Sequence, residues 1–320
     1  MSTVPVPDHA PRIGIVGAGR TQQGLGPYLA AAFAAAGCRV TAVAGRDANG
    51  ALRGAKQLTA TLGHPVDAAA DTAALAGAVD ALVIASPVPS HAAALDAALA
   101  AGVACLCEKP LVGWREAEAG RARIRTFAAR GLLLDENCQW PFVLPALFEL
   151  FPQLRTEPPR EVRMRLSPVG RGPSMVEDSL SHVLSVVQAL VPWASAALLA
   201  EIGQSDARAD AEHNVVRFEL RAGNRQVRVE LHVQHCPQQP RPAWIEVDGC
   251  RMERRIGAGY TISFAGGGRE VKTPDPLRQL VYRFAGLLTQ RSRDRTTALA
   301  NLVDARLRLY ADLLRHVCDG

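Results

Sequence analysis

The sequence predicts a two-domain α/β protein, in which a domain built on a parallel sheet precedes an α/β domain with a large, open, mixed or antiparallel sheet. From Arg12 onward, short β-type runs alternate with alanine-rich helical segments, a pattern typical of parallel strands joined by crossover helices. After Leu150 the pattern changes to alternating charged and apolar residues, which is typical of a partly exposed sheet. The length of 320 residues also favours two hydrophobic cores over one.

The first domain is predicted to cover residues 1–135. Strands are expected at Arg12–Val16, Arg39–Ala44, Ala81–Ala85, Val103–Leu106 and Leu132–Leu134, and helices at Leu25–Ala36, Ala48–Leu62, Ser90–Ala101 and Trp114–Arg130. A glycine follows each helix, where a left-handed residue ends helices favourably (Gly37, Gly63, Gly102, Gly131).

The second domain is predicted to cover residues 136–320. Its strands are expected at Val162–Leu166, Val215–Leu220, Val227–Val233, Trp244–Val247 and Tyr260–Phe264, and its helices at Asp178–Leu190, Leu277–Leu288 and Thr297–Cys318. Prolines near residues 152–159 separate this half from the first.

Composition excludes several classes of protein. The net charge of +5 comes from scattered arginines without interleaved aromatic residues, so an anionic cofactor or substrate is favoured over nucleic acid. Seven cysteines without a CxxC pair indicate a reducing compartment. The N-terminus lacks an export signal, and no apolar run reaches the roughly 20 residues that span a bilayer. We therefore expect a cytoplasmic protein with no membrane partner.

A metal site is not expected. His232, His235 and Cys236 are the best candidates for ligands, but in a strand His232 and His235 point to opposite faces.

A glycine-rich turn follows the first predicted strand and predicts dinucleotide binding. Glycines let the backbone turn tightly and approach a pyrophosphate at the start of a helix. The turn departs from GxGxxG because four residues separate its second and third glycines, and a tight structural turn is the alternative. The predicted cofactor-binding residues here are Gly17, Gly19, Arg20, Thr21 and Gly24.

The end of the second predicted strand bears on the choice of cofactor. Arg46 is placed to accommodate the 2′-phosphate of NADP, whereas Asp47 is of the type that binds the ribose hydroxyls of NAD. NADP is the preferred prediction and NAD stays open.

Lys109 is the first candidate catalytic residue. The chain has 33 arginines and only three lysines, so a lysine that served only as a solvated charge is unexpected. A compact ammonium suits proton handling at a substrate oxygen. The alternative is a surface residue in a strand-to-helix loop.

Asp178 and His182 are the second candidates. Residues four apart share one helix face, and a histidine can exchange the proton that accompanies hydride transfer near neutral pH. The alternative is a helix N-cap at Asp178 beside a structural histidine.

These motifs resemble the glucose-fructose oxidoreductase/inositol dehydrogenase (Gfo/Idh/MocA) family. The resemblance lies in the glycine turn, Ala85-Ser86-Pro87 with His91, Glu108-Lys109-Pro110, and the D-x-x-x-H pattern from Asp178 to His182. It implies a Rossmann domain and an open-sheet domain that commonly mediates oligomerisation, hence a homodimer or homotetramer. It also implies cofactor binding by Ser86, Pro87, His91, Glu108 and Lys109, and acid/base catalysis by Lys109 and His182 with help from Asp178.

Two positions bear on the substrate that the resemblance implies. The family commonly has glycine where this chain has Leu180, a change that narrows the pocket or shifts the helix. Trp140 lies in a region where relatives carry substrate-facing residues, and either stacks on a sugar or packs in the core.

The sequence thus predicts an NAD(P)-dependent oxidoreductase acting on a carbonyl or secondary alcohol of a sugar, nucleotide-sugar or cyclitol. Reduction of a C=N bond on the same fold and a catalytically silent nucleotide sensor are the alternatives.

Overall fold

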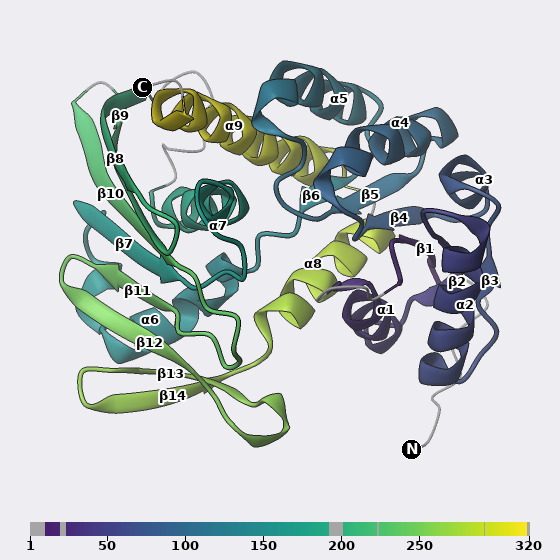
Figure 1. Ribbon diagram of the computed structural model, residues 1–320, viewed down its shortest axis with the longest axis horizontal. Helices are drawn as coiled ribbons and strands as arrows, with labels where there is room; N and C mark the ends of the chain where they lie inside the picture. The colour runs from purple at the N-terminus through teal and green to yellow at the C-terminus, as the bar shows by residue number, and fades with distance from the viewer. Residues whose placement is uncertain (1–9, 20–23, 192–200, 223, 291, 319–320) are drawn as a thin grey trace. The chain divides into compact units, whose positions relative to one another are not determined.

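The computed structural model describes residues 10–19, 24–191, 201–222, 224–290 and 292–318 (Figure 1). The chain forms two compact units. Unit 1 contains the residues up to Asn137 together with Leu277–Val303, and unit 2 contains Cys138–Pro276 and the residues from Asp304 onward.

Unit 1 is built on a six-stranded parallel sheet with the strand order β3-β2-β1-β4-β5-β6. The strands are β1 (Arg12–Val16), β2 (Arg39–Ala44), β3 (Asp67–Ala68), β4 (Ala81–Ile84), β5 (Ala104–Cys107) and β6 (Leu134–Glu136). The helices are α1 (Gly26–Ala35), α2 (Ala48–Leu62), α3 (Thr72–Gly77), α4 (His91–Ala101), α5 (Ala117–Ala129), α8 (Pro276–Gln290) and the start of α9 (Arg293–Cys318), with 3-10 turns η1 (Val88–Ser90) and η2 (Trp114–Glu116).

Helices cover both faces of this sheet (Figure 1). α1 and α2 lie on one face, and α3, α4 and α5 lie on the other. α8 packs beside α1, where the rings of Phe33 and Phe284 meet edge to face at 6.0 Å. Every residue of β4 and β5 is buried, as expected for central strands covered on both sides. Because the strand order reverses between β1 and β4, a ligand crevice is expected at their carboxyl ends.

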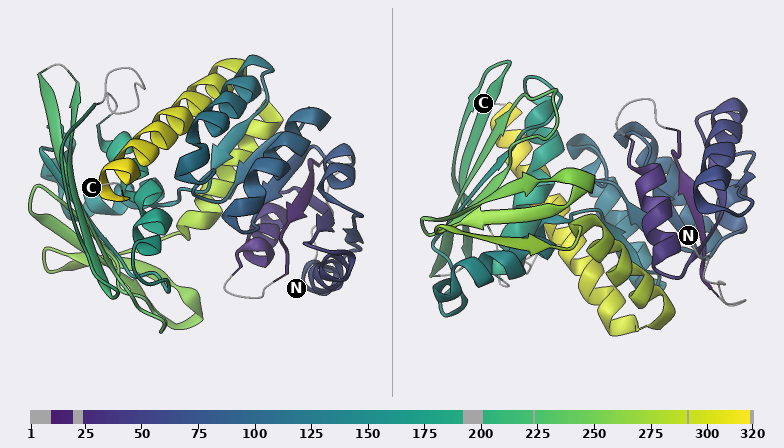
Figure 2. Two further views of the ribbon diagram at one scale, coloured as in Figure 1. Left: turned by 45° about the horizontal axis from the view of Figure 1, so that its top comes forward. Right: turned by 90° about the horizontal axis from the view of Figure 1, so that it is seen from below.

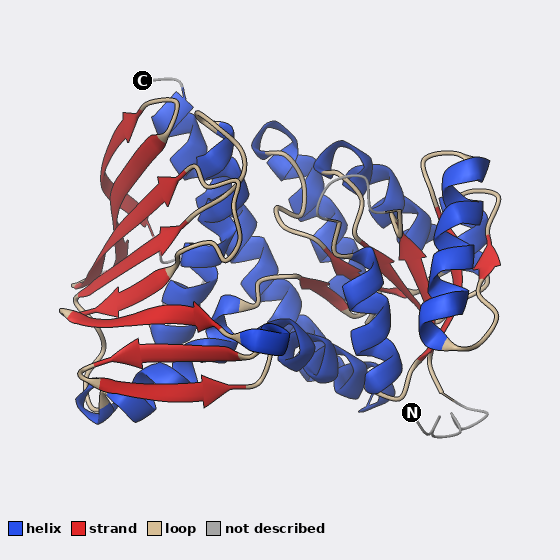
Figure 3. Ribbon diagram, turned by 60° about the horizontal axis from the view of Figure 1, so that its bottom comes forward, coloured by secondary structure: helices blue, strands red, loops and turns tan. Residues whose placement is uncertain are grey.

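Unit 2 is built on an eight-stranded sheet with the order β14-β13-β12-β11-β7-β10-β9-β8 (Figure 3). β7 and β10 pair in parallel, and the other neighbours are antiparallel. The strands are β7 (Glu161–Leu166), β8 (Glu201–Ala209), β9 (His213–Ala222), β10 (Arg225–Gln234), β11 (Trp244–Val247), β12 (Cys250–Ile256), β13 (Ile262–Gly266) and β14 (Arg269–Thr273).

Helices pack on one face of this sheet (Figure 2). They are α6 (Leu144–Leu150), α7 (Ser174–Leu190) and the end of α9, accompanied by the 3-10 turns η3 (Trp140–Val143), η4 (Pro152–Arg155) and η6 (Ala258–Tyr260). Arg306 of α9 donates a hydrogen bond of 3.0 Å to the side chain of Gln188 on α7. The residues of β7 alternate between buried and half-buried, so one face of the strand supplies the core.

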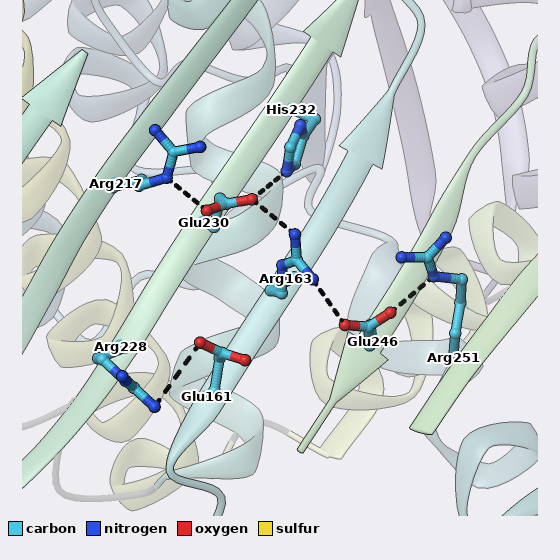
Figure 4. Close-up of polar contacts among 8 residues, drawn as sticks. All are labelled: Glu161, Arg163, Arg217, Arg228, Glu230, His232, Glu246 and Arg251. Atoms are coloured by element: carbon cyan, nitrogen blue, oxygen red, sulfur yellow. Dashed lines mark hydrogen bonds and ion pairs between the residues drawn. The ribbon is translucent and has the colours of Figure 1, made fainter. Parts of the chain in front are cut away.

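The opposite face of the sheet carries a ladder of ion pairs (Figure 4). Arg163 donates to Glu230 at 2.9 Å and to Glu246 at 3.0 Å, and Arg251 donates to Glu246 at 2.7 Å. Arg217 and His232 also bind Glu230. Burial raises the pKa of Glu230, but hydrogen bonds from Arg163, Arg217 and His232 outweigh it and lower that pKa to about 2.

Glu230→Gln should destabilise the protein at neutral pH by about 1–2 kcal/mol, because it removes a carboxylate held by three donors. The native pKa lies below the ordinary value of 4.5, so this stabilisation is present above about pH 4.5 and is lost as the pH falls towards about 2. Urea unfolding of both proteins across this range should show their difference shrinking. A difference that does not change with pH would contradict the lowered pKa of Glu230. Glu157→Gln, at an exposed loop position, is the control.

The predicted fold class is confirmed, and β1, β2, α2 and β11 have the predicted bounds. Two elements differ in ways that matter for the site: β6 lies two residues later than predicted, and α7 begins four residues earlier, at Ser174. Sequence analysis missed β3, α3, α6, β8, β12 and β14. Among the helices of the described residues, none combines the length and the apolar character that a bilayer span requires.

Candidate active site

The glycine turn lies at the crevice predicted between β1 and β4. Gly17 follows β1, has a left-handed φ of +91°, and its N–H donates to the Ala44 carbonyl at 2.9 Å. A Cβ atom on Gly17 would lie 2.7 Å from the backbone nitrogen of Ser86, which follows β4. The two loops therefore pass each other at a distance that only glycine permits.

The same turn leaves room for a phosphate. A Cβ on Gly26, the first residue of α1, would lie 2.7 Å from the Gly17 carbonyl oxygen, so the helix starts directly against the turn. At Gly19, by contrast, a Cβ would meet no atom of the described residues within 4 Å. Pyrophosphate binding requires a tight turn, free space beside a glycine and the N-terminus of a helix, and this turn provides all three. Gly24 lies just before α1, whereas Arg20 and Thr21 fall outside the described residues.

Arg46 and Asp47 at the end of β2 have different environments. The side chain of Arg46 is 96% exposed, with its Nε 3.8 Å from the carboxylate of Asp47. Asp47 is the N-cap of α2 and accepts a hydrogen bond of 2.7 Å from the Gly50 N–H. The aspartate therefore already has a structural role, and the arginine extends into solvent.

His91 is fully buried at the start of α4. Its Nε2 lies 2.8 Å from the Ser86 carbonyl, and its Nδ1 lies 3.1 Å from the Pro110 carbonyl. Burial lowers the pKa of His91, with hydrogen bonds to the backbone and the charge of Glu136 acting in the other direction. Through these contacts His91 joins the loop after β4 to the loop after β5. The contact of His91 with the cofactor stays a prediction. Pro87, also predicted to bind cofactor, precedes η1 in the first of these loops.

Lys109 lies in that second loop, at the carboxyl end of β5. The Glu108 N–H donates to the Ile84 carbonyl at 2.8 Å, so this loop lies beside the end of β4. The side-chain amide of Asn137 donates to the Glu108 carboxylate, and the Leu111 N–H donates to Glu136 at 2.9 Å. Contacts on both sides of Lys109 thus fix its backbone.

Sequence analysis missed Glu136 and Asn137, although a polar run directly after an apolar strand was the signal. We predicted that β6 ends at Leu134, but it continues through Asp135 and Glu136. Both carboxylates are buried because each has a partner: Arg283 of α8 binds Asp135, and the Leu111 N–H binds Glu136. Paired charges are the exception to the rule that acidic residues stay exposed.

Glu136→Ala should loosen the loop that carries Lys109. This substitution leaves the buried Leu111 N–H without an acceptor, which lowers the stability of the loop by about 1–3 kcal/mol. Hydrogen exchange of the segment 108–112 should therefore rise by about tenfold or more. Glu136→Gln is the control, because its amide oxygen can still accept this bond. Unchanged exchange in the alanine variant would show that Glu136 does not hold the loop.

Asp178 and His182 lie on α7 in unit 2. Because the helix starts at Ser174 after Pro173, Asp178 is in its second turn and is not the N-cap. Asp178 is exposed and His182 is half-buried, four residues along the same face. This geometry removes the helix-cap explanation for the D-x-x-x-H pattern.

Leu180 and Trp140 both belong to the core of unit 2. Leu180 is fully buried, so it lies on the core side of α7. Trp140 is 5% exposed, and its ring packs edge to face against Phe264 at 6.4 Å. The guanidinium of Arg254 lies 5.5 Å from the centroid of the Trp140 ring. These contacts indicate that Trp140 packs in the core and favour this role over stacking on a sugar.

No group of three or more metal-binding side chains occurs in the described part of the chain. His232 binds Glu230, and β10 ends before His235 and Cys236.

The fold and the glycine turn define a dinucleotide-binding Rossmann domain. Residues 11–135 match the family model GFO_IDH_MocA, which describes an oxidoreductase family with an NAD-binding Rossmann fold. This match confirms, for residues 11–135, the resemblance drawn from the sequence motifs. No curated protein sequence matched the chain.

Solved structures with similar folds extend over nearly the whole chain. UDP-N-acetylglucosamine 3-dehydrogenase GnnA from Acidithiobacillus ferrooxidans has a TM-score of 0.68 at 21% identity, covering 96% of this chain and 97% of its own. An inositol dehydrogenase homolog from Azotobacter vinelandii, complexed with NADH and myo-inositol, has a TM-score of 0.67 at 17% identity, covering 96% and 94%. A mutant of KijD10, a 3-ketoreductase from Actinomadura kijaniata in complex with TDP-benzene and NADP, has a TM-score of 0.65 at 20% identity, covering 96% and 98%. At these identities the likeness establishes the two-domain fold.

Proposed function

We propose that this protein is an NAD(P)-dependent oxidoreductase that moves a hydride between nicotinamide and a carbonyl or secondary alcohol of a small polar substrate. A sugar, nucleotide-sugar or cyclitol is the proposed substrate, the classes named in the similar structures. The observation that carries the proposal is the sheet edge of unit 1, where the glycine turn follows β1 and the fixed Lys109 loop follows β5, the two strands on either side of β4.

In the proposed chemistry the protein handles the proton and the charge. The nicotinamide, when bound, supplies or accepts the hydride at its C4 carbon. Lys109 donates a hydrogen bond to the reacting oxygen and stabilises negative charge on it. His182 takes the hydroxyl proton when the alcohol is oxidised and returns it when the carbonyl is reduced. Asp178 orients the substrate or the histidine from the same helix face.

We propose NADP as the preferred cofactor. Arg46 is exposed directly after β2, where an arginine can bind a 2′-phosphate. The carboxylate of Asp47 caps α2, and this bond competes with one to a ribose hydroxyl. Both observations favour the phosphorylated cofactor.

Turnover assays with NADP⁺ and NADPH test the proposal. Sugars, nucleotide-sugars, cyclitols and cyclic imines should be screened by the absorbance of reduced nicotinamide. Turnover with alcohols or carbonyls alone supports the proposal, and turnover with imines alone supports the C=N reductase. Tight cofactor binding without turnover in any class would support the sensor.

We also propose a cytoplasmic homodimer or homotetramer that assembles through the open sheet face of unit 2. The ladder from Glu161 to Arg251 alternates positive and negative groups, which suits a self-complementary two-fold contact. The cysteines whose side chains the structure describes, Cys38, Cys105, Cys107, Cys138, Cys236 and Cys250, are free thiols, which supports a reducing compartment. Light scattering tests the assembly: an oligomer that dissociates at high salt supports it, and a monomer at all salt concentrations refutes it.

A further inference from the structure

A groove opens in unit 2 beside the segment that joins α6 to β7. Its volume is about 600 Å³, within the range of about 300–1,000 Å³ that is typical of small-molecule sites. Most of its lining is apolar and comes from α6, η4, the end of α7 and β11, including Pro145, Phe148, Leu154, Leu190 and Val247. Arg155, Thr156 and Glu157 supply its polar part. The groove therefore suits a ligand with an apolar body and a small polar end.

The segment that carries these polar residues is tied at both ends to the turn between β11 and β12. Near its start, the side-chain amide of Gln153 donates to the Cys250 sulfur at 3.3 Å. At its end, the Arg160 N–H donates to the Asp248 carboxylate at 3.1 Å. Between them, the Thr156 hydroxyl donates to the Gln153 carbonyl at 2.9 Å. A ligand thus meets a rim that is already ordered, which lowers the entropy cost of binding.

Arg155 and Glu157 place opposite charges at the groove. Both residues are exposed, and in the part of the chain that the structure describes neither side chain has an ion-pair partner. The Arg155 guanidinium lies over the Phe148 ring, 5.7 Å from its centroid. A ligand with one negative and one positive group can therefore bind both residues without breaking an existing ion pair. The apolar lining strengthens such contacts, because it lowers the local dielectric constant.

We infer that this groove binds a free α-amino acid with an apolar side chain. The carboxylate of the amino acid binds Arg155, whose forked guanidinium matches its two oxygens, and the ammonium binds Glu157. The apolar side chain covers Phe148, Leu154 and Leu190, which are each half-buried without it. The inference is independent of the proposed function, because all of these residues belong to unit 2 and none takes part in the proposed chemistry.

Calorimetric titration with L-leucine and its truncated analogues tests this site. Leucinamide lacks the carboxylate, 4-methylpentanoate lacks the ammonium, and glycine lacks the apolar side chain. Leucine should bind more tightly than each analogue, by about tenfold for each charge removed, the usual worth of a charged hydrogen bond. Binding of any analogue as tightly as leucine, or no binding of leucine at millimolar concentration, would overturn the inference.

Substitutions assign the two charges. Arg155→Gln should weaken leucine binding by about tenfold and leave leucinamide binding unchanged, because leucinamide has no carboxylate. Glu157→Gln should weaken leucine binding to a similar degree and leave 4-methylpentanoate binding unchanged. Arg160→Gln is the matched control, because it removes an exposed arginine of the same segment that does not line the groove.

The three substituted positions are exposed, so each variant should fold, and thermal unfolding without ligand verifies this. Arg160→Gln should bind leucine as the unaltered protein does. Equal weakening in this control, or unchanged leucine binding in Arg155→Gln or Glu157→Gln, would show that these two charges do not hold a ligand.

Discussion

Lys109→Ala should lower kcat by about two to four orders of magnitude, the usual range for loss of a group that handles a proton in the transition state. Binding of NADPH should change little. The loop backbone is fixed on both sides of Lys109, because Asn137 donates to Glu108 and the Leu111 N–H donates to Glu136. The effect should therefore appear in kcat and not in the stability of the fold.

Two further variants sharpen this result. Lys109→Arg keeps the positive charge but not the compact ammonium, so most of the loss should persist. Lys272→Ala removes an exposed lysine of β14 and should leave kcat unchanged. Full activity of Lys109→Ala on any substrate found would remove Lys109 from the mechanism.

Replacing Gly17 or Gly19 by alanine should have different effects on the stability of the fold, although both changes should weaken NADPH binding. In Gly17→Ala the new methyl group meets the Ser86 backbone and the residue keeps a left-handed φ, so both stability and NADPH binding should be lost. The conformational term alone is about 1–2 kcal/mol. In Gly19→Ala the methyl group meets no atom of the described residues within 4 Å, so the fold should remain stable.

Gly19→Ala should nevertheless weaken NADPH binding by about tenfold or more, because the methyl group fills space that the pyrophosphate needs. Thermal unfolding measures the stability of the fold, and fluorescence titration measures NADPH binding. Gly77→Ala, in α3 with equally open surroundings, is the control. Normal NADPH binding by Gly19→Ala would place the pyrophosphate elsewhere.

The first domain was predicted well because its signals are local. The bounds of α2 coincide with the prediction because Asp47 caps its start and a left-handed Gly63 ends it. Lys109, Asp178 and His182 could be proposed as site residues from the sequence alone, because rarity, motif and spacing need no knowledge of the folded chain.

The features that were missed depend on distant partners. β6 continues through Asp135 and Glu136 only because Arg283 and the Leu111 N–H bind them. Likewise, Arg283 belongs to α8, and nothing local indicated that this late segment packs within unit 1. His91 was assigned to the cofactor from its motif, whereas its contacts with two backbone loops require the folded chain.

The central claim is that unit 1 binds a pyridine dinucleotide, and a titration with NADPH and with NADH tests it most directly. Fluorescence and thermal shift should show tighter binding of NADPH, and Arg46→Ser should remove that preference without weakening NADH. Tighter binding of NADH would instead indicate that Asp47 binds the ribose hydroxyls of the cofactor. Failure of both nucleotides to bind would contradict the account of this protein as a nicotinamide-dependent oxidoreductase.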